Sequence, residues 1–378
     1  MAIETMNKPG LAPETEAQLA EAVRDAKGPL CLQGGGTRGV TCDGDVLDTR
    51  GLSGITLYEP GALTLAAQAG TPLDEIEAAL RAEGQRLPFE PMDPRGLLGT
   101  SGAPTIGGVV AGNVSGPRRL QAGACRDYML GVRFVDGMGT VIKNGGRVMK
   151  NVTGYDLVKL MTGSWGSLGA LSEVSLKVLP RPEAAACLLV DGLDVAQAVQ
   201  LMAEAMGSPY EITGAAHDPE SAAGQPVTML RIEGFAQSVA YRASALQAMF
   251  GLHEVRVESD PEAVADTWRR VRDVDKLHGR DGDVWRISCK PSDAPELALR
   301  LQAEAQLFDW AGGLIWALLP AGTDARERLG AYDGYATQVR GTGDLPMFQP
   351  QPAAIAALSR GLKQRFDPRG ILNPGILV

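Results

Sequence analysis

The chain has 378 residues, 44% of them hydrophobic, and a formal net charge of −9 at pH 7. This length suits two domains, and this share of hydrophobic residues supplies a sizeable core, which excludes wholesale disorder. The excess of acidic over basic residues, 45 to 36, argues against a general nucleic-acid-binding protein and against a basic protein of membrane surfaces.

The N-terminal part of the chain is predicted to combine short strands with a glycine-rich loop. The strand at residues 29–32 runs directly into the loop Gly34–Gly39. Pro60-Gly61 is a strong turn signal between two further strands, and Thr71 fits the N-cap of the next helix. The expected elements, in order, are a helix at residues 13–26, strands at 29–32, 55–59 and 63–69, and the helix that follows Thr71.

A second glycine-rich segment spans residues 104–116, with four glycines, one proline, one asparagine and mostly small side chains. Glycine costs backbone entropy and offers no side chain to bury, so the segment is predicted to be a poor helix interior and a poor strand. It suits a place where the backbone approaches a ligand closely. Together with the loop Gly34–Gly39, it indicates a large ligand that carries phosphate.

The residues after this segment lead to a predicted domain boundary. Asp156 is expected to cap a short helix, and the proline pair in Pro180-Arg181-Pro182 stops the last strand before the boundary. The expected elements are strands at 128–135 and 140–143 that pair as a hairpin, a helix at 156–161, a third glycine-rich loop at 163–169 and a strand at 171–178.

Beyond the boundary, strands alternate with longer helices, which predicts a ferredoxin-like α+β sandwich with helices on one face of a sheet. The chain then ends in a helix at 353–365 and a segment rich in proline and glycine. The predicted fold class is α+β. The predicted units are residues 1–182, residues 183–350 and a C-terminal segment, 351–378, that returns to the first unit. The expected strands of the second unit are 185–190, 227–233, 252–258, 284–289 and 314–319.

The first loop also satisfies the GxGxxG pattern of a Rossmann dinucleotide site, and Glu59 lies about twenty residues further on. That site requires a helix that begins inside the glycines. Residues 40–45 instead contain two β-branched residues and a glycine, without a helical period. We therefore favour a loop whose successive N–H groups surround an anion.

Several short motifs follow one another in a characteristic order. They are the loop Gly34–Gly39, Tyr58-Glu59-Pro60-Gly61, Gly70-Thr71-Pro72-Leu73, Leu87-Pro88-Phe89-Glu90-Pro91, Thr105-Ile106-Gly107-Gly108 and Gly163-Ser164. Their order resembles the FAD-binding domain of the p-cresol methylhydroxylase (PCMH) and vanillyl-alcohol oxidase flavoproteins over about residues 28–182. The resemblance implies a two-subdomain PCMH-type FAD-binding domain followed by a smaller ferredoxin-like α+β cap domain.

Three further motifs make the chain similar to the E subunits of bacterial glycolate oxidases. They are Val152-Thr153-Gly154-Tyr155-Asp156, Trp285-Arg286-Ile287-Ser288 and the ending that contains Asn373-Pro374-Gly375. This resemblance implies an FAD-dependent oxidoreductase acting on a small 2-hydroxy acid. It also implies a complex with a catalytic, FAD-containing D-type subunit and an iron–sulfur F-type subunit.

The resemblance further implies which residues hold FAD. The first loop is expected at the pyrophosphate, where glycine N–H groups and the Thr37 hydroxyl can donate hydrogen bonds. Arg38 either pairs with a phosphate or projects into solvent. The second segment is expected beside the flavin and the third loop near the adenine, and a structural turn without ligand is the alternative for each. The FAD-binding residues are expected to be Gly34, Gly35, Gly36, Thr37, Arg38, Gly39, Pro104, Thr105, Gly107, Gly108, Asn113, Ser115, Gly116, Gly166, Gly169, Leu171 and Asn373.

Non-covalent FAD is predicted, although many relatives attach FAD through a histidine or cysteine. All three histidines lie beyond residue 182, and Cys42 and Cys125 are more simply small buried thiols than attachment points. The five cysteines are widely spaced without a CxxC pair, so neither a disulfide framework nor a zinc or iron–sulfur site is expected. The histidines are scattered, and no metal site is predicted.

The catalytic residues stay unknown at this stage. Flavin-dependent oxidation of a hydroxy acid requires a group that takes the hydroxyl proton and a cation that holds the carboxylate. Arg286 and Lys290 are weak candidates for that cation, and a salt bridge or a solvated position is an equally good interpretation of each.

The leading prediction is an FAD-binding subunit of a glycolate-type oxidase complex, whose flavin relays electrons or supports assembly while a partner oxidises the substrate. One alternative is a self-sufficient FAD-dependent dehydrogenase of glycolate or D-lactate, and another is a structural subunit with a degenerate flavin site. The N-terminus lacks signal-peptide features and no apolar run could span a membrane. A cytoplasmic protein is therefore expected, or one peripheral to the inner membrane through its partners.

Overall fold

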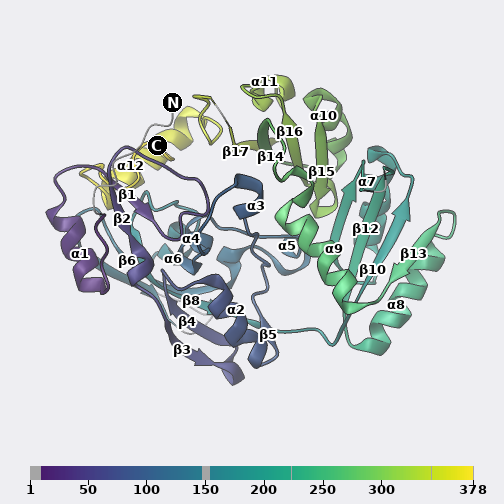
Figure 1. Ribbon diagram of the computed structural model, residues 1–378, viewed down its shortest axis with the longest axis horizontal. Helices are drawn as coiled ribbons and strands as arrows, with labels where there is room; N and C mark the ends of the chain where they lie inside the picture. The colour runs from purple at the N-terminus through teal and green to yellow at the C-terminus, as the bar shows by residue number, and fades with distance from the viewer. Residues whose placement is uncertain (1–9, 147–153, 223, 342, 378) are drawn as a thin grey trace.

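The computed structural model describes residues 10–146, 154–222, 224–341 and 343–377 of the chain. Figure 1 shows two regions side by side: the N-terminal region in purple to blue, and the cap region in teal to green. The chain passes from one to the other between β9 (Leu179–Pro180) and β10 (Ala184–Asp191). The architecture is α+β, as predicted, whereas the division into folding units at residue 182 stays a prediction.

An antiparallel five-stranded sheet, in the order β3-β4-β8-β6-β7, forms the larger part of the N-terminal region. The predicted hairpin is confirmed as β6 and β7, and α2 (Leu73–Ala82) packs its apolar stripe into the core beside the sheet. The predicted cap of α2 is wrong: Pro72 is the N-cap, because the Thr71 hydroxyl donates to the Gln68 carbonyl of the preceding turn. The strands are β3 (Ile55–Glu59), β4 (Thr64–Gln68), β6 (Met129–Val135), β7 (Val141–Gly145) and β8 (Ala170–Lys177).

A smaller layer joins the two ends of the described chain. β1 (Leu30–Gln33) pairs in parallel with β2 (Asp45–Asp48), and Leu372 bridges in parallel to Leu30. Helix α1 (Glu16–Asp25) begins at a capping box and buries its apolar face in this layer. The end of the chain therefore lies beside the first glycine-rich loop, which follows β1.

The second glycine-rich segment contains a short helix, so the expectation that it is a poor helix interior is wrong. Helix α4 (Ile106–Ala111) begins at Thr105, whose Oγ1 accepts a hydrogen bond from the Gly108 N–H at 3.3 Å. A Cβ on Gly107 would lie 2.6 Å from the Ala69 carbonyl oxygen, so close packing requires glycine there. Burial of the larger side chains of α4 offsets the entropic cost of its glycines.

The remaining elements of the N-terminal region are short. Asp156 caps α6 as predicted, by accepting a hydrogen bond from the Lys159 N–H. Residues 152 and 153 of the motif Val152–Asp156 lie outside the described residues. The helices are α3 (Arg95–Leu98), α5 (Arg119–Ala122) and α6 (Leu157–Met161), and β5 (Gln85–Arg86) pairs with β9. No helix among the described residues is long and apolar enough to cross a membrane.

The cap region contains one eight-stranded antiparallel sheet, in the order β13-β10-β12-β11-β15-β16-β14-β17. Each half of it runs strand, helix, strand, strand, helix, strand, which is the connectivity of a ferredoxin-like unit. The two units meet where β11 pairs with β15, at His217 opposite Phe308. The first unit comprises β10, α7 (Val195–Gly207), β11 (Ile212–Asp218), β12 (Val227–Gly234), α8 (Ala236–Met249) and β13 (Val255–Glu258). The second comprises β14 (Asp283–Cys289), α10 (Ala294–Leu301), β15 (Ala305–Asp309), β16 (Leu314–Leu319), α11 (Ala325–Leu329) and β17 (Gly334–Arg340).

The prediction of a sheet with helices on one face is confirmed for four helices. α7, α8, α10 and α11 share one core with the sheet. Helix α9 (Pro261–Asp273), which connects the two units, packs on the opposite face through Trp268. The rest of that face, including Leu314 and Trp316, packs against Met92 and Leu97 of the N-terminal region. The cap therefore presents one face of its sheet to the N-terminal region.

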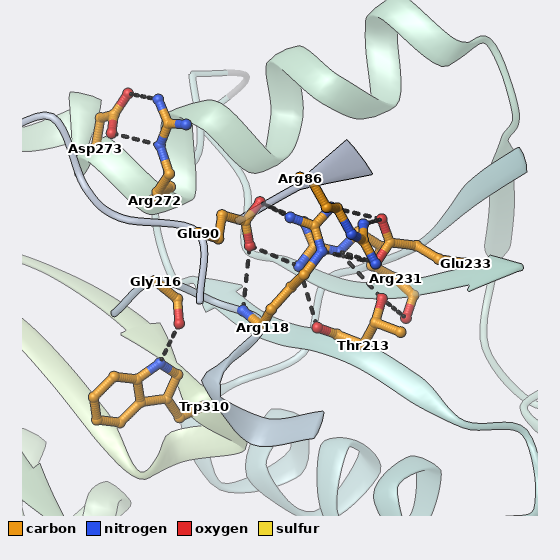
Figure 2. A network of polar contacts seen from close by, with 10 residues as sticks. All are labelled: Arg86, Glu90, Gly116, Arg118, Thr213, Arg231, Glu233, Arg272, Asp273 and Trp310. Carbon is orange, nitrogen blue, oxygen red and sulfur yellow. Dashed lines mark hydrogen bonds and ion pairs between the residues drawn. The ribbon is translucent and has the colours of Figure 1, made fainter. Parts of the chain in front are cut away.

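Five charged side chains hold the two regions together, and we call them the interdomain cluster (Figure 2): Arg86, Glu90, Arg118, Arg231 and Glu233. Arg231 of β12 donates two hydrogen bonds of 3.0 Å to Glu90, and Arg118 donates two to Glu233, at 2.9 and 2.6 Å. Arg86 adds a bond of 2.9 Å to Glu233. Burial alone raises the pKa of both carboxyls, but the arginines outweigh it and hold both pKa values below the ordinary range. Each guanidinium of this cluster thus faces a carboxylate.

The C-terminal segment packs on the N-terminal region. Helix α12 (Ala353–Phe366), yellow in Figure 1, carries Lys363, whose ammonium donates to the Ser167 carbonyl at 2.8 Å and to the Leu372 carbonyl at 2.6 Å. It also pairs with the buried Asp367 at 2.8 Å. These bonds place the end of the chain beside the third glycine-rich loop.

Candidate functional site

All three glycine-rich loops and the C-terminal segment line one groove in the N-terminal region. A concave surface lined by glycines and a few polar side chains is typical of small-molecule and cofactor sites. Twelve of the seventeen expected FAD-binding residues line it: Gly34, Gly35, Gly36, Thr37, Arg38, Thr105, Gly107, Gly108, Gly166, Gly169, Leu171 and Asn373. We call it the loop groove.

The first loop packs against the second glycine-rich segment backbone to backbone. A Cβ on Gly35 would lie 1.7 Å from the Ala103 carbonyl oxygen, so no other residue fits this position without moving the chain. Only backbone fits between the two segments here. A glycine-rich loop of this kind can offer successive N–H groups to a pyrophosphate.

Arg38 connects the first loop to helix α4. Its Nε donates a hydrogen bond of 3.2 Å to the Gly108 carbonyl, and it has no ion pair among the described residues. Burial lowers the pKa of Arg38 to about 10, so the guanidinium stays charged at neutral pH. A half-buried cation without a carboxylate favours a phosphate partner over projection into solvent.

Helix α4 lines the loop groove at Gly108, where the missing side chain leaves space. The nearest atom to a Cβ built on Gly108 is Thr105 Oγ1, at an ordinary contact distance of 3.4 Å. A larger side chain at this position would therefore enter the groove without disturbing the backbone. The glycine leaves room for a ligand, which is the fit expected for FAD.

Asn373 ties the third loop to β1. Its Nδ2 donates to the Trp165 carbonyl at 2.7 Å, and its Oδ1 accepts from the Leu32 N–H at 2.7 Å. A Cβ on Gly166 would lie 2.8 Å from Asn373 Nδ2, so this loop too is packed tightly. One side chain from the end of the chain therefore closes the groove.

A second cavity lies between the N-terminal region and the cap. It contains three more of the expected FAD-binding residues, Asn113, Ser115 and Gly116, together with the catalytic candidate Arg286. Arg38 and Trp165 line both spaces, so the loop groove continues into this second cavity. The second glycine-rich segment thus separates two connected compartments. We call the second one the cap cavity.

Three expected site residues line neither compartment. Gly39 and Pro104 are next to lining residues in the sequence but do not line either compartment themselves. Lys290 lies on the surface, where its 61% exposed side chain pairs with Asp333 at 2.8 Å. Its position just after the end of β14 keeps it out of the cavity that Arg286 lines, and we withdraw it as a cation for the substrate carboxylate.

Several lining residues of the cap cavity were not predicted. Arg119, Asp309, Trp316 and Tyr335 come from elements of both regions. No local pattern marks them, because they meet only where the cap sheet covers the N-terminal region. Trp165 could have been suspected, since it is the one bulky aromatic side chain inside the third glycine-rich loop.

The cysteines and histidines suggest neither attachment of FAD nor a metal. Cys42 and Cys125 line neither compartment, and burial raises the pKa of Cys42 to about 12. His217 is fully buried in the cap sheet, where burial lowers its pKa to about 4. Within the described ranges, no three His, Cys, Asp or Glu side chains gather as metal ligands would. Non-covalent binding of FAD stays a prediction.

Comparison with known proteins agrees with this geometry. A family model for the FAD binding domain matches residues 10–145. Glycolate oxidase subunit GlcE of Escherichia coli is 37% identical over 364 residues, which cover 95% of each chain. Glycolate oxidase subunit GlcD of Bacillus subtilis is 35% identical over 166 residues, or 43% of this chain and 34% of that protein. A solved alkyldihydroxyacetonephosphate synthase superposes with a TM-score of 0.72 over 96% of this chain and 75% of its own, at 17% identity, which shows the fold alone.

Proposed function

Because this chain belongs to the family of FAD-binding glycolate oxidase subunits, we propose that it is the FAD-carrying E-type subunit of a 2-hydroxy-acid oxidase complex. The observation that carries the proposal is the identity of 37% along 95% of both chains, together with a groove in which the expected FAD residues gather. FAD, when bound, accepts two electrons as a hydride and can release them one at a time.

The chain's own residues have distinct tasks toward FAD in this proposal. The N–H groups of the first loop and the charge of Arg38 hold the pyrophosphate, since both face the loop groove. Asn373 and the third loop enclose the adenine side. Helix α4 ends at Gly112 and leads into Asn113 and Ser115, which line the cap cavity and would hold the flavin ring at the junction of the two compartments.

We propose that a D-type flavosubunit oxidises the substrate while the flavin of this chain relays electrons or supports assembly. The absence of a histidine cluster in the described part of the cap supports this division. An iron–sulfur subunit is a further proposed partner. We propose that this chain would lie at the inner membrane only through its partner subunits. Co-expression with D-type and F-type chains and a tag on this chain alone tests both partners. Recovery of this chain alone would refute the complex.

A second candidate function is independent oxidation of a 2-hydroxy acid, which Arg286 in the cap cavity favours. The purified chain distinguishes the two candidates by its visible spectrum under anaerobic glycolate or D-lactate. A yellow protein that stays oxidised supports the relay, whereas bleaching supports independent catalysis. A colourless protein that takes up no FAD would refute both and leave a structural role.

Substitution of Gly108 tests the loop groove directly. We expect Gly108→Leu to lose FAD while the chain keeps its fold, because the new side chain enters open space. The measurement is the flavin absorbance per protein after gel filtration, with circular dichroism for folding. Gly61→Leu is the control, since a Cβ there meets nothing within 4 Å and lies outside both compartments. Full FAD content in Gly108→Leu would remove α4 from the site.

Acid denaturation should release all flavin, in keeping with non-covalent binding.

A further inference from the structure

The cap cavity contains more positive charge than its own carboxylates neutralise. Arg38, Arg119, Arg272 and Arg286 line it, and of the residues that the structure describes Asp309 is the one acidic lining residue. Arg272 is occupied by a bidentate pair with Asp273, at 2.7 Å for each bond. Arg38 faces the loop groove as well, where the phosphates of FAD are expected. Arg119 and Arg286 therefore remain for a further ligand.

Arg119 and Arg286 are held by one indole ring. The guanidinium carbon of Arg119 lies 4.7 Å from the ring centroid of Trp310, and that of Arg286 lies 4.9 Å from it. The Trp310 Nε1–H donates to the Gly116 carbonyl at 3.1 Å, which fixes the ring between the two regions. Stacking on the ring orients both guanidiniums and leaves their N–H donors available.

Neither guanidinium has a hydrogen bond or an ion pair within the part of the chain that the structure describes. Burial, and to a lesser extent the nearby charge of Arg119, lowers the pKa of Arg286 to about 10. Because this value lies well above 7, Arg286 is still charged at neutral pH. Buried guanidiniums without a counter-ion are costly, and an anionic ligand would offset this cost. Five N–H donors on each arginine match a carboxylate or a phosphate.

Among the described residues, Asp309 is the one carboxyl that lines the cavity with this pair, and it does not neutralise the pair below its raised pKa. Its one hydrogen bond among the described residues comes from the Trp310 N–H, at 2.7 Å. Burial raises the pKa of Asp309 to about 7, so near that pH a large share of the carboxyl is protonated and uncharged. We call Arg119, Arg286 and Asp309 the cavity cluster. A neutral carboxyl near Arg286 does not repel an anionic ligand and can donate a hydrogen bond to it.

The walls of the cap cavity beyond the cluster are largely apolar. Leu314 and Trp316 from β16 and Tyr335 and Val339 from β17 line the cap side. These side chains belong to one sheet and face the N-terminal region. A two-carbon acid such as glycolate has little apolar surface of its own with which to contact these walls. Their apolar surface indicates a ligand with an aliphatic or aromatic body.

We propose that the cap cavity of this chain binds a small monocarboxylate with an apolar side chain, whose carboxylate contacts Arg286 and Arg119. This deepens the function proposed above and rests on it, because the flavin ring would occupy the part of the cavity beside Asn113 and Ser115. The ligand class is a 2-hydroxy or 2-oxo acid larger than glycolate. The site belongs to this subunit, and a partner subunit is not needed to complete it.

Titration calorimetry of the purified chain, with its FAD content measured on the same sample, tests the proposal. The probes are 2-hydroxyisocaproate, its methyl ester and glycolate. We expect the acid to bind, the uncharged ester to bind at least about tenfold more weakly, and glycolate to bind more weakly than the larger acid. Equal binding of acid and ester, or tighter binding of glycolate, would overturn the proposal.

Two arginine variants and a surface control locate the ligand. Arg286→Met and Arg119→Met should each weaken binding of 2-hydroxyisocaproate at least about tenfold, and Arg286→Lys should restore part of it. Lys290→Met, four residues further along the chain and on the surface, should bind like the original protein. Unchanged binding in a folded Arg286→Met would refute the site. If that variant does not fold, unchanged binding in Arg119→Met refutes the site in its place.

The binding test of the cap cavity and the test of the proposed function can fail independently of each other. A yellow chain that binds no monocarboxylate refutes this inference and leaves the FAD-carrying function intact. A chain that takes up no FAD refutes the proposed function, and the titration still decides whether the cavity binds the acid.

Discussion

Arginine side chains have different roles in the interdomain cluster and in the cavity cluster. In the interdomain cluster, three arginines share two carboxylates at 2.6–3.0 Å, and Arg231 also bonds to Thr213. In the cavity cluster, two arginines stack on Trp310 and face a cavity instead of a carboxylate. A paired arginine between two regions stabilises their arrangement, whereas an arginine without an ion pair beside a cavity is available to bind a ligand.

Breaking the interdomain cluster should have the largest effect on stability. We expect Glu233→Gln to lower the free energy of unfolding by about 3 to 5 kcal/mol, because it leaves buried guanidiniums without their carboxylate. Urea unfolding followed by circular dichroism measures this. Asp191→Asn is the matched control: it removes an ion pair with Arg256 that is largely exposed, and should cost no more than about 1 kcal/mol. Equal losses in the two variants would contradict a stabilising role for the cluster.

The cavity cluster should instead respond to pH through its ligand. Asp309 is neutral below its raised pKa of about 7 and charged above it. Binding of 2-hydroxyisocaproate should therefore weaken, roughly tenfold, as the pH rises from 6 to 8, because the new carboxylate repels the ligand and pairs with Arg286. The groups that face Asp309 are Arg286, Arg231, Glu90 and the Trp310 N–H. The pKa of Arg286 is about 10 and that of Glu90 lies below its ordinary range, so neither group changes charge between pH 6 and 8.

Calorimetry at pH 6, 7 and 8 checks this expectation. Asp309→Asn is the control, because its amide stays neutral and should make the affinity independent of pH over this interval. A pH dependence that persists in Asp309→Asn would assign it to another group.

The smallest effect should be that of Arg286→Met on stability. We expect the free energy of unfolding to change by less than about 1 kcal/mol, because no carboxylate loses a partner and the methionine can pack on Trp310. The same urea experiment measures this, without added acid. A loss comparable to that of Glu233→Gln would show that Arg286 is a structural residue, and the contrast between the two clusters would disappear.

The loops and much of the fold could be predicted from local sequence patterns. The strand and glycines around residues 30–39, the hairpin of β6 and β7 and the cap at Asp156 each depend on neighbouring residues. Helix α4 could not be predicted in this way, because its glycines are unfavourable locally and packing against Ala69 compensates for them. The division of the cap into two ferredoxin-like units was not predicted, because the expected strands did not include β11, β15 or β17.

The sequence by itself determined the cofactor class, the α+β fold and most of the residues of the loop groove, because backbone N–H groups for a phosphate come from one short loop. Only the tertiary structure decided which charges are paired. Glu90 and Arg231 lie 141 positions apart in the chain, and Gly116 and Trp310 lie 194 apart. Contacts over such separations leave no periodic signal in the sequence. The same residue type can therefore be a structural ion pair in one place and a ligand-binding cation in another.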